Sequence, residues 1–470
     1  MIKFMCSVCD DVVKYKDFLH CDSCGNIGTS IRVEVGEESE TSGSSKGKHF
    51  GYSGSKQEES EKLSGVVEKT HDRIKTGFDE LDIVMGGGGI VSDSVNLISG
   101  DPGIGKSTLL LQVAINVSNS GYKVLYITGE ESKHQVKARA NRISENIDNI
   151  YICTSSDVEF NIEQIKKIQP SFLIVDSIQT MYVPTLTSSV GSTTQIKESA
   201  SAITRYCKRN NIATFIVGHI TKDGEIAGPK VLEHIVDGVF YFEGDDNGEY
   251  RILRSNKNRF GRVNEMSVFA MKSFGLEEVK DPSSIFITDD IDDTTGNVIY
   301  LGKDGSRPIM MEIQALVTET QSDNARRLSV GVDRDRLNLM LAIIQKQTAF
   351  RMYKYDVYTT VVGGIKINET GYDLALIAAI LSSLTDRKID KTIGFFGEVG
   401  LSGEVKNVQN ADLRISDARK RGLKKVVLPY SSFEKLDASL KKGITLHPIK
   451  NIRELIAFIE KNSKIIKIDN

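Results

Sequence analysis

The 470-residue sequence predicts an α/β protein, and three observations support that fold class. Residues 95–114 hold a β-prone run, a glycine-rich loop and an apolar helical run in direct succession. Short apolar runs at 124–127, 172–175 and 213–217 have the length and composition of buried strands. The chain is also longer than one hydrophobic core usually supports, so we expect about two or three domains.

The glycine-rich loop has the spacing G-x-x-x-x-G-K-S of a phosphate-binding loop. Its glycines let backbone N–H groups turn toward phosphates, Lys106 supplies a point charge, and the Ser107 hydroxyl is a ligand for Mg²⁺. A chance glycine-rich turn is the alternative, and the flanking strand and helix patterns argue against it. The predicted nucleotide site comprises Gly100, Asp101, Pro102, Gly103, Ile104, Gly105, Lys106, Ser107 and Thr108.

Polar side chains stand at the ends of the three later strands, where ligands bind in open α/β sheets. Glu130 is expected to orient or deprotonate an attacking water, with Glu131 the less favoured candidate. Asp176 is expected to hold Mg²⁺, and His219 to sense the γ-phosphate. The alternatives are that the glutamates only favour the start of the next helix and that the histidine is structural.

Four cysteines near the N-terminus form two C-x-x-C pairs with eleven residues between them. Four thiolates make a closed tetrahedral site, which stabilises a segment too short for its own core. A redox dithiol is the alternative, but it needs only one pair. The spacing therefore predicts a structural zinc site formed by Cys6, Cys9, Cys21 and Cys24.

The segment 31–65 is rich in Gly, Ser, Glu and Lys and has few apolar residues to bury. This composition predicts a flexible linker between the cysteine-containing module and the rest of the chain. A tethered mobile module and a plain solvated spacer are both consistent with it.

Residues 251–262 carry five cationic side chains and no acidic one. Such a run is usually a solvated face. It is also what a cationic finger inserted into a neighbouring subunit, or a contact with a phosphate backbone, requires. The polar stretch 221–229 has two interpretations as well: a plain surface connection, or a loop that orders on DNA.

The composition limits the class of protein and its compartment. A formal net charge of −3 excludes a globally basic nucleic-acid binder but permits a local basic groove. No apolar run reaches the roughly 18 residues of a membrane helix, and the first residues lead into cysteines instead of a signal-peptide core. Cys153 and Cys207 stand alone, which suits a reducing compartment. We therefore expect a cytoplasmic protein without membrane contact.

Taken together, these motifs resemble those of the bacterial RadA, or Sms, family of RecA-like ATPases. The resemblance rests on the cysteine pairs, the glycine loop and the segments 129–132, 218–222, 232–234, 257–261 and 397–403. The segment 257–261, Lys-Asn-Arg-Phe-Gly, is that family's own signature. The resemblance implies a C4 zinc finger at 1–30, the linker at 31–65, a RecA-like P-loop ATPase core at 66–280 and a Lon-protease-like α/β domain at 281–470.

The same resemblance implies a function and its partners. The expected activity is a DNA-dependent ATPase that drives branch migration of recombination intermediates in DNA repair, with ATP, Mg²⁺ and Zn²⁺ as cofactors. The expected assembly is a homohexameric ring on single-stranded DNA, working with the RecA recombinase. Lys257 and Arg259 are then expected to act in catalysis at the subunit interface or near DNA.

The C-terminal region resembles the Lon protease domain. Its expected elements are a helix at 334–350, strands near 358–362 and 393–396, and a helix at 413–421. Proteolysis of the Lon type needs a serine activated by a lysine, and the matching positions hold Asp373 and Asp412. We therefore expect a proteolytically inactive domain that serves assembly or DNA contact.

Two alternatives to a DNA motor stay open. One is an ATP-dependent Lon-like protease built from the same two domains, against which the absent serine and lysine argue. The other is a nucleotide-switched DNA-binding scaffold without motor activity.

Overall fold

The computed structural model describes residues 71–219, 229–244, 248–287, 294–322 and 324–466, residues 62 and 64, and the backbone of 2–6, 12–13 and 30–34. The chain divides into two compact units, Met1–Phe50 and Gly51–Asn470.

The first unit contains a small antiparallel sheet in the order β2-β1-β3. Its strands are β1 (Ile2–Cys6), β2 (Val12–Val13) and β3 (Ser30–Glu34). The pairing of β3 with β1 runs to Glu34 opposite Ile2, so residues 31–34 are part of a strand, whereas the predicted linker began at 31. The alternating apolar and polar residues of this segment are a strand pattern that the composition of the linker obscured.

The second unit begins with a nine-stranded sheet in the order β14-β13-β12-β11-β6-β10-β9-β7-β8. Strands from β8 to β11 run parallel, and β12 to β14 continue the sheet in antiparallel fashion. The strands are β6 (Val95–Gly100), β7 (Val124–Thr128), β8 (Ile150–Cys153), β9 (Phe172–Asp176), β10 (Ala213–His219), β11 (Gly238–Gly244), β12 (Tyr250–Asn258), β13 (Met266–Lys272) and β14 (Gly275–Glu278). A separate pair joins β4 (Arg73–Ile74) to β5 (Ile90–Val91).

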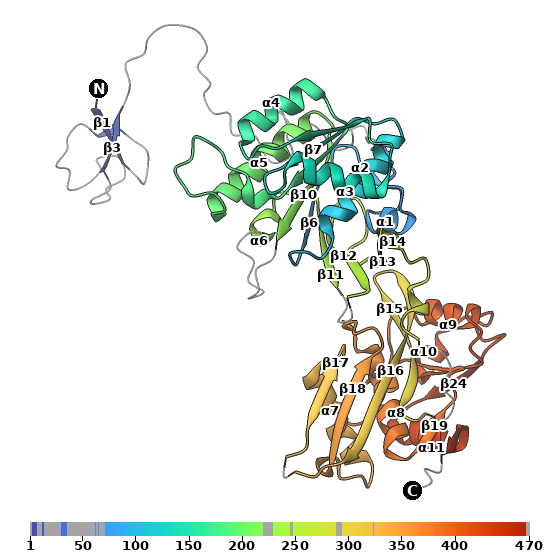
Figure 1. Ribbon diagram of the computed structural model, residues 1–470. Coiled ribbons are helices and arrows are strands. Elements are labelled where there is room, and N and C mark those ends of the chain that lie inside the picture. Colours follow the sequence, from blue (N-terminus) through green and yellow to red (C-terminus); the bar gives the residue numbers. More distant parts are fainter. Residues whose placement is uncertain are drawn as a thin grey trace. The chain divides into compact units, whose positions relative to one another are not determined.

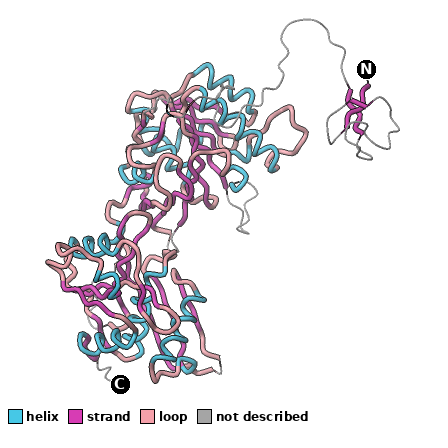
Figure 2. Tube along the Cα trace, turned by 180° about the vertical axis from the view of Figure 1, so that it is seen from behind, coloured by secondary structure: helices cyan, strands magenta, loops and turns pink. Residues whose placement is uncertain are grey.

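Helices cover both faces of this sheet (Figures 1 and 2). They are α1 (Asp79–Val84), α2 (Lys106–Asn119), α3 (Lys133–Ile143), α4 (Val158–Ile168), η2 (Ile178–Thr180), α5 (Thr193–Arg209) and α6 (Pro229–Leu232). Tyr126 and Ile174 pack into a core with α1, α2 and α3, whereas Leu125 and Val175 pack into a second core with α4 and α5. Because both faces are buried, the strands are continuous apolar runs, and their polar residues fall at the carboxyl ends.

A second sheet follows, in the order β17-β18-β16-β15-β20-β23-β24. Its strands are β15 (Asn297–Asp304), β16 (Arg307–Glu319), β17 (Arg327–Val330), β18 (Tyr355–Val361), β20 (Ile393–Phe395), β23 (Lys425–Pro429) and β24 (Thr445–Ile449). Two short pairs are β19 (Arg387–Ile389) with β25 (Ser463–Ile465), and β21 (Glu398–Val399) with β22 (Val405–Lys406). The helices are η3 (Pro282–Ser284), α7 (Arg334–Gln347), η4 (Met352–Lys354), η5 (Thr370–Tyr372), α8 (Asp373–Leu384), α9 (Ala411–Lys420), α10 (Tyr430–Glu434) and α11 (Ile452–Asn462).

The predicted elements of this region lie within a few residues of the observed ones. The helix expected to reach residue 350 ends at Gln347, because Thr348 is already extended. Helix α8 is central to the core: it packs on β15 and β16, and its residues from Asp373 to Ser382 are buried.

The two sheets also share apolar packing at their boundary, in addition to the cores on the faces of the first sheet. Ile252, Met266 and Val268, from β12 and β13, belong to the same hydrophobic cluster as the strands and helices after residue 281. An ion pair between Arg307 and the largely buried Glu80 joins the β15–β16 hairpin to α1. Among the residues that the structure describes, no helix has the length and apolarity needed to span a membrane.

Candidate active site

The glycine-rich loop leaves β6 and enters α2, as its flanking patterns predicted. Gly103 and Gly105 have φ angles of +78° and +114°, which a residue with a Cβ rarely adopts. The Lys106 ammonium donates to the carbonyl oxygens of Gly100 at 2.7 Å and Asp101 at 2.9 Å. Burial lowers the pKa of Lys106 to about 8, although Asp176, Asp101 and Glu130 oppose that shift.

A strand on the other side of the sheet supports the loop. Arg251 Nε, on β12, donates to the Ile104 carbonyl at 2.9 Å. The first three residues of the loop, 101–103, are exposed, so phosphates can reach its backbone N–H groups from solvent.

Asp176 ends β9, opposite Thr128 at the end of β7. Its carboxylate is buried and accepts a hydrogen bond of 2.5 Å from the Tyr126 hydroxyl. Burial and the Asp176 charge raise the pKa of Tyr126 well above its ordinary value. The hydroxyl therefore keeps its proton and acts as the donor.

Glu130 faces the same edge of the sheet. Its Oε1 accepts a hydrogen bond from the Ser177 hydroxyl and lies 3.3 Å from His219 Nε2. The hydrogen bond from His219 is the main cause that lowers the pKa of Glu130, with Ser177 and Lys106 contributing and burial opposing. An ionised carboxylate beside the phosphate loop is suited to accept a proton from water.

Glu131 points elsewhere. It forms an ion pair with Arg139 of α3, and its Oε2 is buried without a hydrogen-bond partner among the described residues. Ser132 caps that helix through a reciprocal pair of hydrogen bonds with Gln135. The structure thus gives different partners to the two adjacent glutamates, of which the sequence analysis already favoured Glu130.

His219 ends β10, opposite Gly100 at the start of the phosphate loop. Its carbonyl accepts a hydrogen bond from the Gln179 amide at 3.2 Å. Within the described part of the chain, Nδ1 of His219 and Oε1 of Gln179 are buried without partners. Residues 220–228, including Lys222 of the proposed DNA loop, lie outside the described residues.

These groups together form a donor set for a magnesium-bound polyphosphate. Ser107 follows Lys106 in the first turn of α2, and Asp176 ends β9, which is two strands away from β6 in the same sheet. Hydroxyl and carboxylate oxygens are the ligands that Mg²⁺ prefers, and a helix start with its dipole favours phosphate. The residues present therefore fit both the ion and the nucleotide.

Lys257 and Arg259 of the segment 257–261 bind groups of their own chain. Lys257 donates to the carbonyls of Glu233 and Val236, which follow α6. Arg259 lies 3.2 Å from the buried Asp237, and half of its side chain is exposed. Among the described residues, the hydrogen bonds and ion pairs of Lys257 and Arg259 go to the segment 233–237 and not to Lys106 or Glu130, so the structure does not bring them into the candidate nucleotide site of the same chain.

The cationic run 251–262 is not a single patch. Arg251 supports the phosphate loop, and Arg254 pairs with Asp304 of β15. Arg262 is exposed. The five cationic side chains are spread along β12 and the turn after it, and they do not share one set of contacts.

The Lon-like region places Asp373 at the start of α8, fully buried. Both of its oxygens are engaged: Arg336 donates to them, and the Val399 N–H donates to Oδ2 at 2.9 Å. Burial raises the pKa of Asp373, and Arg336 opposes that shift. Asp412, at the other matching position, is exposed on α9.

Comparisons with known proteins agree with both halves of this architecture. A family model described as the KaiC ATPase matches residues 74–153, and one described as the Lon protease (S16) C-terminal proteolytic domain matches residues 350–460. The DNA repair protein RadA of Pseudomonas aeruginosa is 44% identical over 88% of this chain and 90% of its own length. The Bacillus subtilis protein of that name is 39% identical over 97% of each chain, and the Listeria monocytogenes protein is 40% identical over 91% and 92%.

This chain belongs to the DNA repair protein RadA family. The resemblance inferred from the motifs is thereby confirmed, as is the fold class of a P-loop ATPase core joined to a Lon-type domain.

The zinc prediction for this RadA family member falls largely outside the described residues. Cys9, Cys21 and Cys24 are not described, and only the backbone of Cys6 is, within β1. Among the described residues, no cluster of three or more His, Cys, Asp or Glu side chains could hold a metal ion. Cys153 and Cys207 are free thiols, and burial raises the pKa of both.

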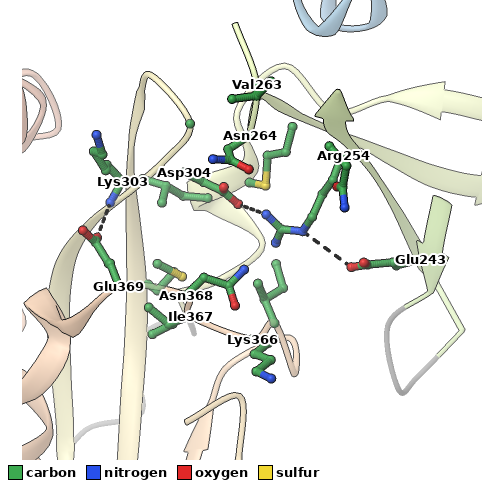
Figure 3. Close-up of a pocket in the computed structure, with 16 residues that line it drawn as sticks. Glu243, Arg254, Val263, Asn264, Lys303, Asp304, Lys366, Ile367, Asn368 and Glu369 are labelled. Atoms are coloured by element: carbon green, nitrogen blue, oxygen red, sulfur yellow. Dashed lines mark hydrogen bonds and ion pairs between the residues drawn. The ribbon is translucent and has the colours of Figure 1, made fainter. Parts of the chain in front are cut away.

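A polar cavity of about 620 Å³ lies where β12 meets the tip of the β15–β16 hairpin (Figure 3). Arg254 lies between Asp304 and Glu243 in this cavity, 3.5 Å from Glu243. On the opposite wall, Glu369 accepts a hydrogen bond from the Lys303 N–H at 3.0 Å. Because its lining residues come from β11 and β12 on one side and from the region after residue 281 on the other, the cavity lies at the junction between the ATPase sheet and the Lon-type domain.

Sequence reasoning missed four residues that bind the residues it singled out at this edge of the sheet: Tyr126, Arg139, Ser177 and Gln179. Two of these four residues could have been noticed from the sequence. Tyr126 is the one polar-tipped residue in the apolar run 124–127, and Ser177 directly follows the predicted magnesium ligand. Arg139 and Gln179 reach the site through helical turns, and nothing local in the sequence distinguishes them.

Proposed function

We propose that this RadA family member is a magnesium-dependent ATPase that acts in DNA repair. The observation that supports this most strongly is the convergence of Lys106, Glu130 and Asp176 at one edge of a parallel sheet, beside a phosphate loop with open backbone N–H groups. Membership in a family whose characterised members are named DNA repair proteins supports the biological role.

The mechanism assigns each step to a residue of the chain. Backbone N–H groups of Gly103 and Gly105 and the Lys106 ammonium bind the phosphates of ATP. Ser107 and Asp176 would hold Mg²⁺, which neutralises phosphate charge when bound. Glu130 then accepts a proton from the attacking water at a carboxylate oxygen.

The groups around Glu130 give it the right state for that role. Ser177 and His219 hold its carboxylate by hydrogen bonds and keep it ionised. His219 also stands opposite Gly100, so a change in the bound phosphate can pass to residues 220–228, the proposed DNA-responsive loop.

The finer proposal is a motor. We propose a homohexameric ring on single-stranded DNA that migrates branched recombination intermediates in the cytoplasm together with the RecA recombinase. Lys257 and Arg259 would then act at the subunit interface or near DNA, after leaving their acceptors at Glu233, Val236 and Asp237. The Lon-type domain at 281–470 would serve assembly or DNA contact, next to the ATPase domain proposed at 66–280.

A structural zinc ion is proposed in the N-terminal module at 1–30. Its support is the chemistry of four thiolates in two C-x-x-C pairs, at Cys6, Cys9, Cys21 and Cys24. About one zinc per chain is expected on metal analysis of protein purified without chelator, and none would overturn the assignment.

Proteolysis is not proposed. A buried aspartate that is paired with Arg336 and bonded to the Val399 N–H cannot serve as a serine nucleophile does.

The test of the proposed function is Lys106→Ala, with Lys123→Ala as an exposed control. Lys106→Ala should lower ATP hydrolysis by at least about a hundredfold, because a preorganised charge at the phosphates is lost. In the same samples, wild-type protein should displace labelled strands from a recombination intermediate with ATP, but not with a non-hydrolysable analogue. Unchanged hydrolysis in Lys106→Ala would remove the ATPase assignment, and displacement with the analogue would remove the motor.

A further inference from the structure

Tyr126 brings a hydroxyl into a core that is otherwise apolar. Its side chain is fully buried, and its ring packs with residues of α2 and α3 on one face of the sheet. Burying a hydroxyl without a partner is costly, and a phenylalanine would fill the same space without that cost. The hydrogen bond to Asp176 offsets the cost of burying the Tyr126 hydroxyl.

The register of the sheet explains how the two side chains meet. Tyr126 on β7 is paired with Ile174 on β9, two residues before Asp176. Paired residues of neighbouring strands point to the same face, and so do residues two apart on one strand. The side chains of Tyr126, Ile174 and Asp176 therefore share one face of the sheet. The long tyrosine side chain reaches forward along that face to the carboxylate at 2.5 Å.

We infer that Tyr126 is a positioning residue for the magnesium-binding carboxylate, an inference that rests on the proposed ATPase function. By donating to Oδ2, the hydroxyl fixes the rotation of the Asp176 carboxylate and leaves Oδ1 for the ion. Groups that orient a metal ligand in this way contribute strongly to metal affinity, although they do not touch the metal.

A purely structural hydroxyl would stabilise the fold and have no effect on magnesium. The chain contains a matched case for comparison. Tyr300, on β15, is also fully buried, and its hydroxyl donates to the Glu369 carboxylate, far along the sequence from the nucleotide site. Tyr126→Phe and Tyr300→Phe each remove a buried hydroxyl–carboxylate bond while keeping the ring, and Tyr300→Phe also removes the acceptor of a 3.3 Å hydrogen bond from Arg414.

The experiment is a magnesium titration of nucleotide binding in the full-length chain. A fluorescent, non-hydrolysable ATP analogue reports binding, and manganese paramagnetic resonance reports the ion directly. Tyr126→Phe should raise the half-saturating concentration of Mg²⁺ by roughly tenfold or more. Its binding of the analogue in the presence of chelator should equal that of wild type. Tyr300→Phe should match wild type in both measurements.

Each outcome is decisive. A magnesium response in Tyr126→Phe equal to that of wild type would overturn the inference while leaving the ATPase intact. An equal shift in Tyr300→Phe would show that the effect comes from general loosening of the fold, and would also overturn it. Failure of wild-type protein to hydrolyse ATP would instead refute the proposed function.

Discussion

Two carboxylate sites in this chain, one partly open to solvent and one enclosed, have opposite degrees of hydrogen-bond satisfaction. At the carboxyl edge of the first sheet, around Glu130 and Asp176, two buried polar atoms of neighbouring residues have no partner among the described residues: Gln179 Oε1 and His219 Nδ1. At the start of α8, both oxygens of Asp373 are engaged by Arg336 and the Val399 N–H. Polar atoms without a protein partner beside a phosphate loop are available to a ligand or water, whereas the saturated oxygens of Asp373 are not.

The pKa shifts of the two sites also have opposite directions. His219 and Ser177 lower the pKa of Glu130, so its carboxylate is ionised and ready to accept a proton. Burial raises the pKa of Asp373 against the opposing charge of Arg336. A carboxylate enclosed in this way supports a helix and a neighbouring strand, and it has no access to a substrate.

The sharpest test of this comparison is Glu130→Gln beside Glu131→Gln. Loss of the general base should lower kcat of Glu130→Gln by about a thousandfold, with little change in stability. Glu131→Gln should lower kcat only slightly, because that side chain is paired with Arg139 away from Lys106. Steady-state kinetics with thermal melting would measure both, and equal losses in the two variants would contradict the assignment.

For Asp373→Ala in the Lon-type domain, we expect a loss of stability without a loss of kcat. Removing the carboxylate leaves Arg336 and the Val399 N–H without their acceptor, which should lower the free energy of unfolding by about 2–4 kcal/mol. The estimate is below that for a fully buried pair because the Arg336 side chain is 22% exposed. Urea denaturation monitored in that domain measures it.

The control for that variant is Asp412→Ala, which replaces an exposed side chain and should change stability by less than about 0.5 kcal/mol. The ATPase kcat of folded Asp373→Ala should remain that of wild type. A loss of kcat without a loss of stability would place Asp373 in a functional site after all.

The smallest expected effect is a pH dependence of nucleotide binding. Burial lowers the pKa of Lys106 to about 8, so the lysine is charged below that pH and increasingly neutral above it. Because phosphates bind the charged form, the dissociation constant for ATP should rise with pH above 8, by up to about tenfold per pH unit.

Equilibrium binding across this range checks that sign, with Lys106→Arg as the control. An arginine stays charged, so whatever affinity that variant keeps should change little between about pH 7 and about pH 9. A wild-type dissociation constant that is flat above pH 8 would show that Lys106 does not control binding through its charge.

Local patterns were sufficient to predict the elements that form the candidate nucleotide site. The loop from Gly100 to Ser107 and the strand ends at Asp176 and His219 were predictable, because a glycine turn and apolar runs ending in polar residues are encoded within a few residues. The Lon-type domain was recognisable in the same way, although its helix at Arg334–Gln347 is three residues shorter than the pattern suggested.

Other features depend on contacts between segments that are far apart in the sequence. Which of Glu130 and Glu131 faces Lys106 depends on Ser177, His219 and Arg139, which come from three other elements. The acceptors of Lys257 are backbone carbonyls more than twenty residues away, and no side-chain pattern could reveal them.

The sequence by itself thus determined the chemistry that is available: a phosphate loop, carboxylates at strand ends and an aspartate in place of a serine. The tertiary structure decided which of those groups are left open for a ligand and which are saturated by the fold. The physical reason is that helix and strand periodicity are local properties, whereas the hydrogen-bond satisfaction of a buried carboxylate depends on every segment packed around it.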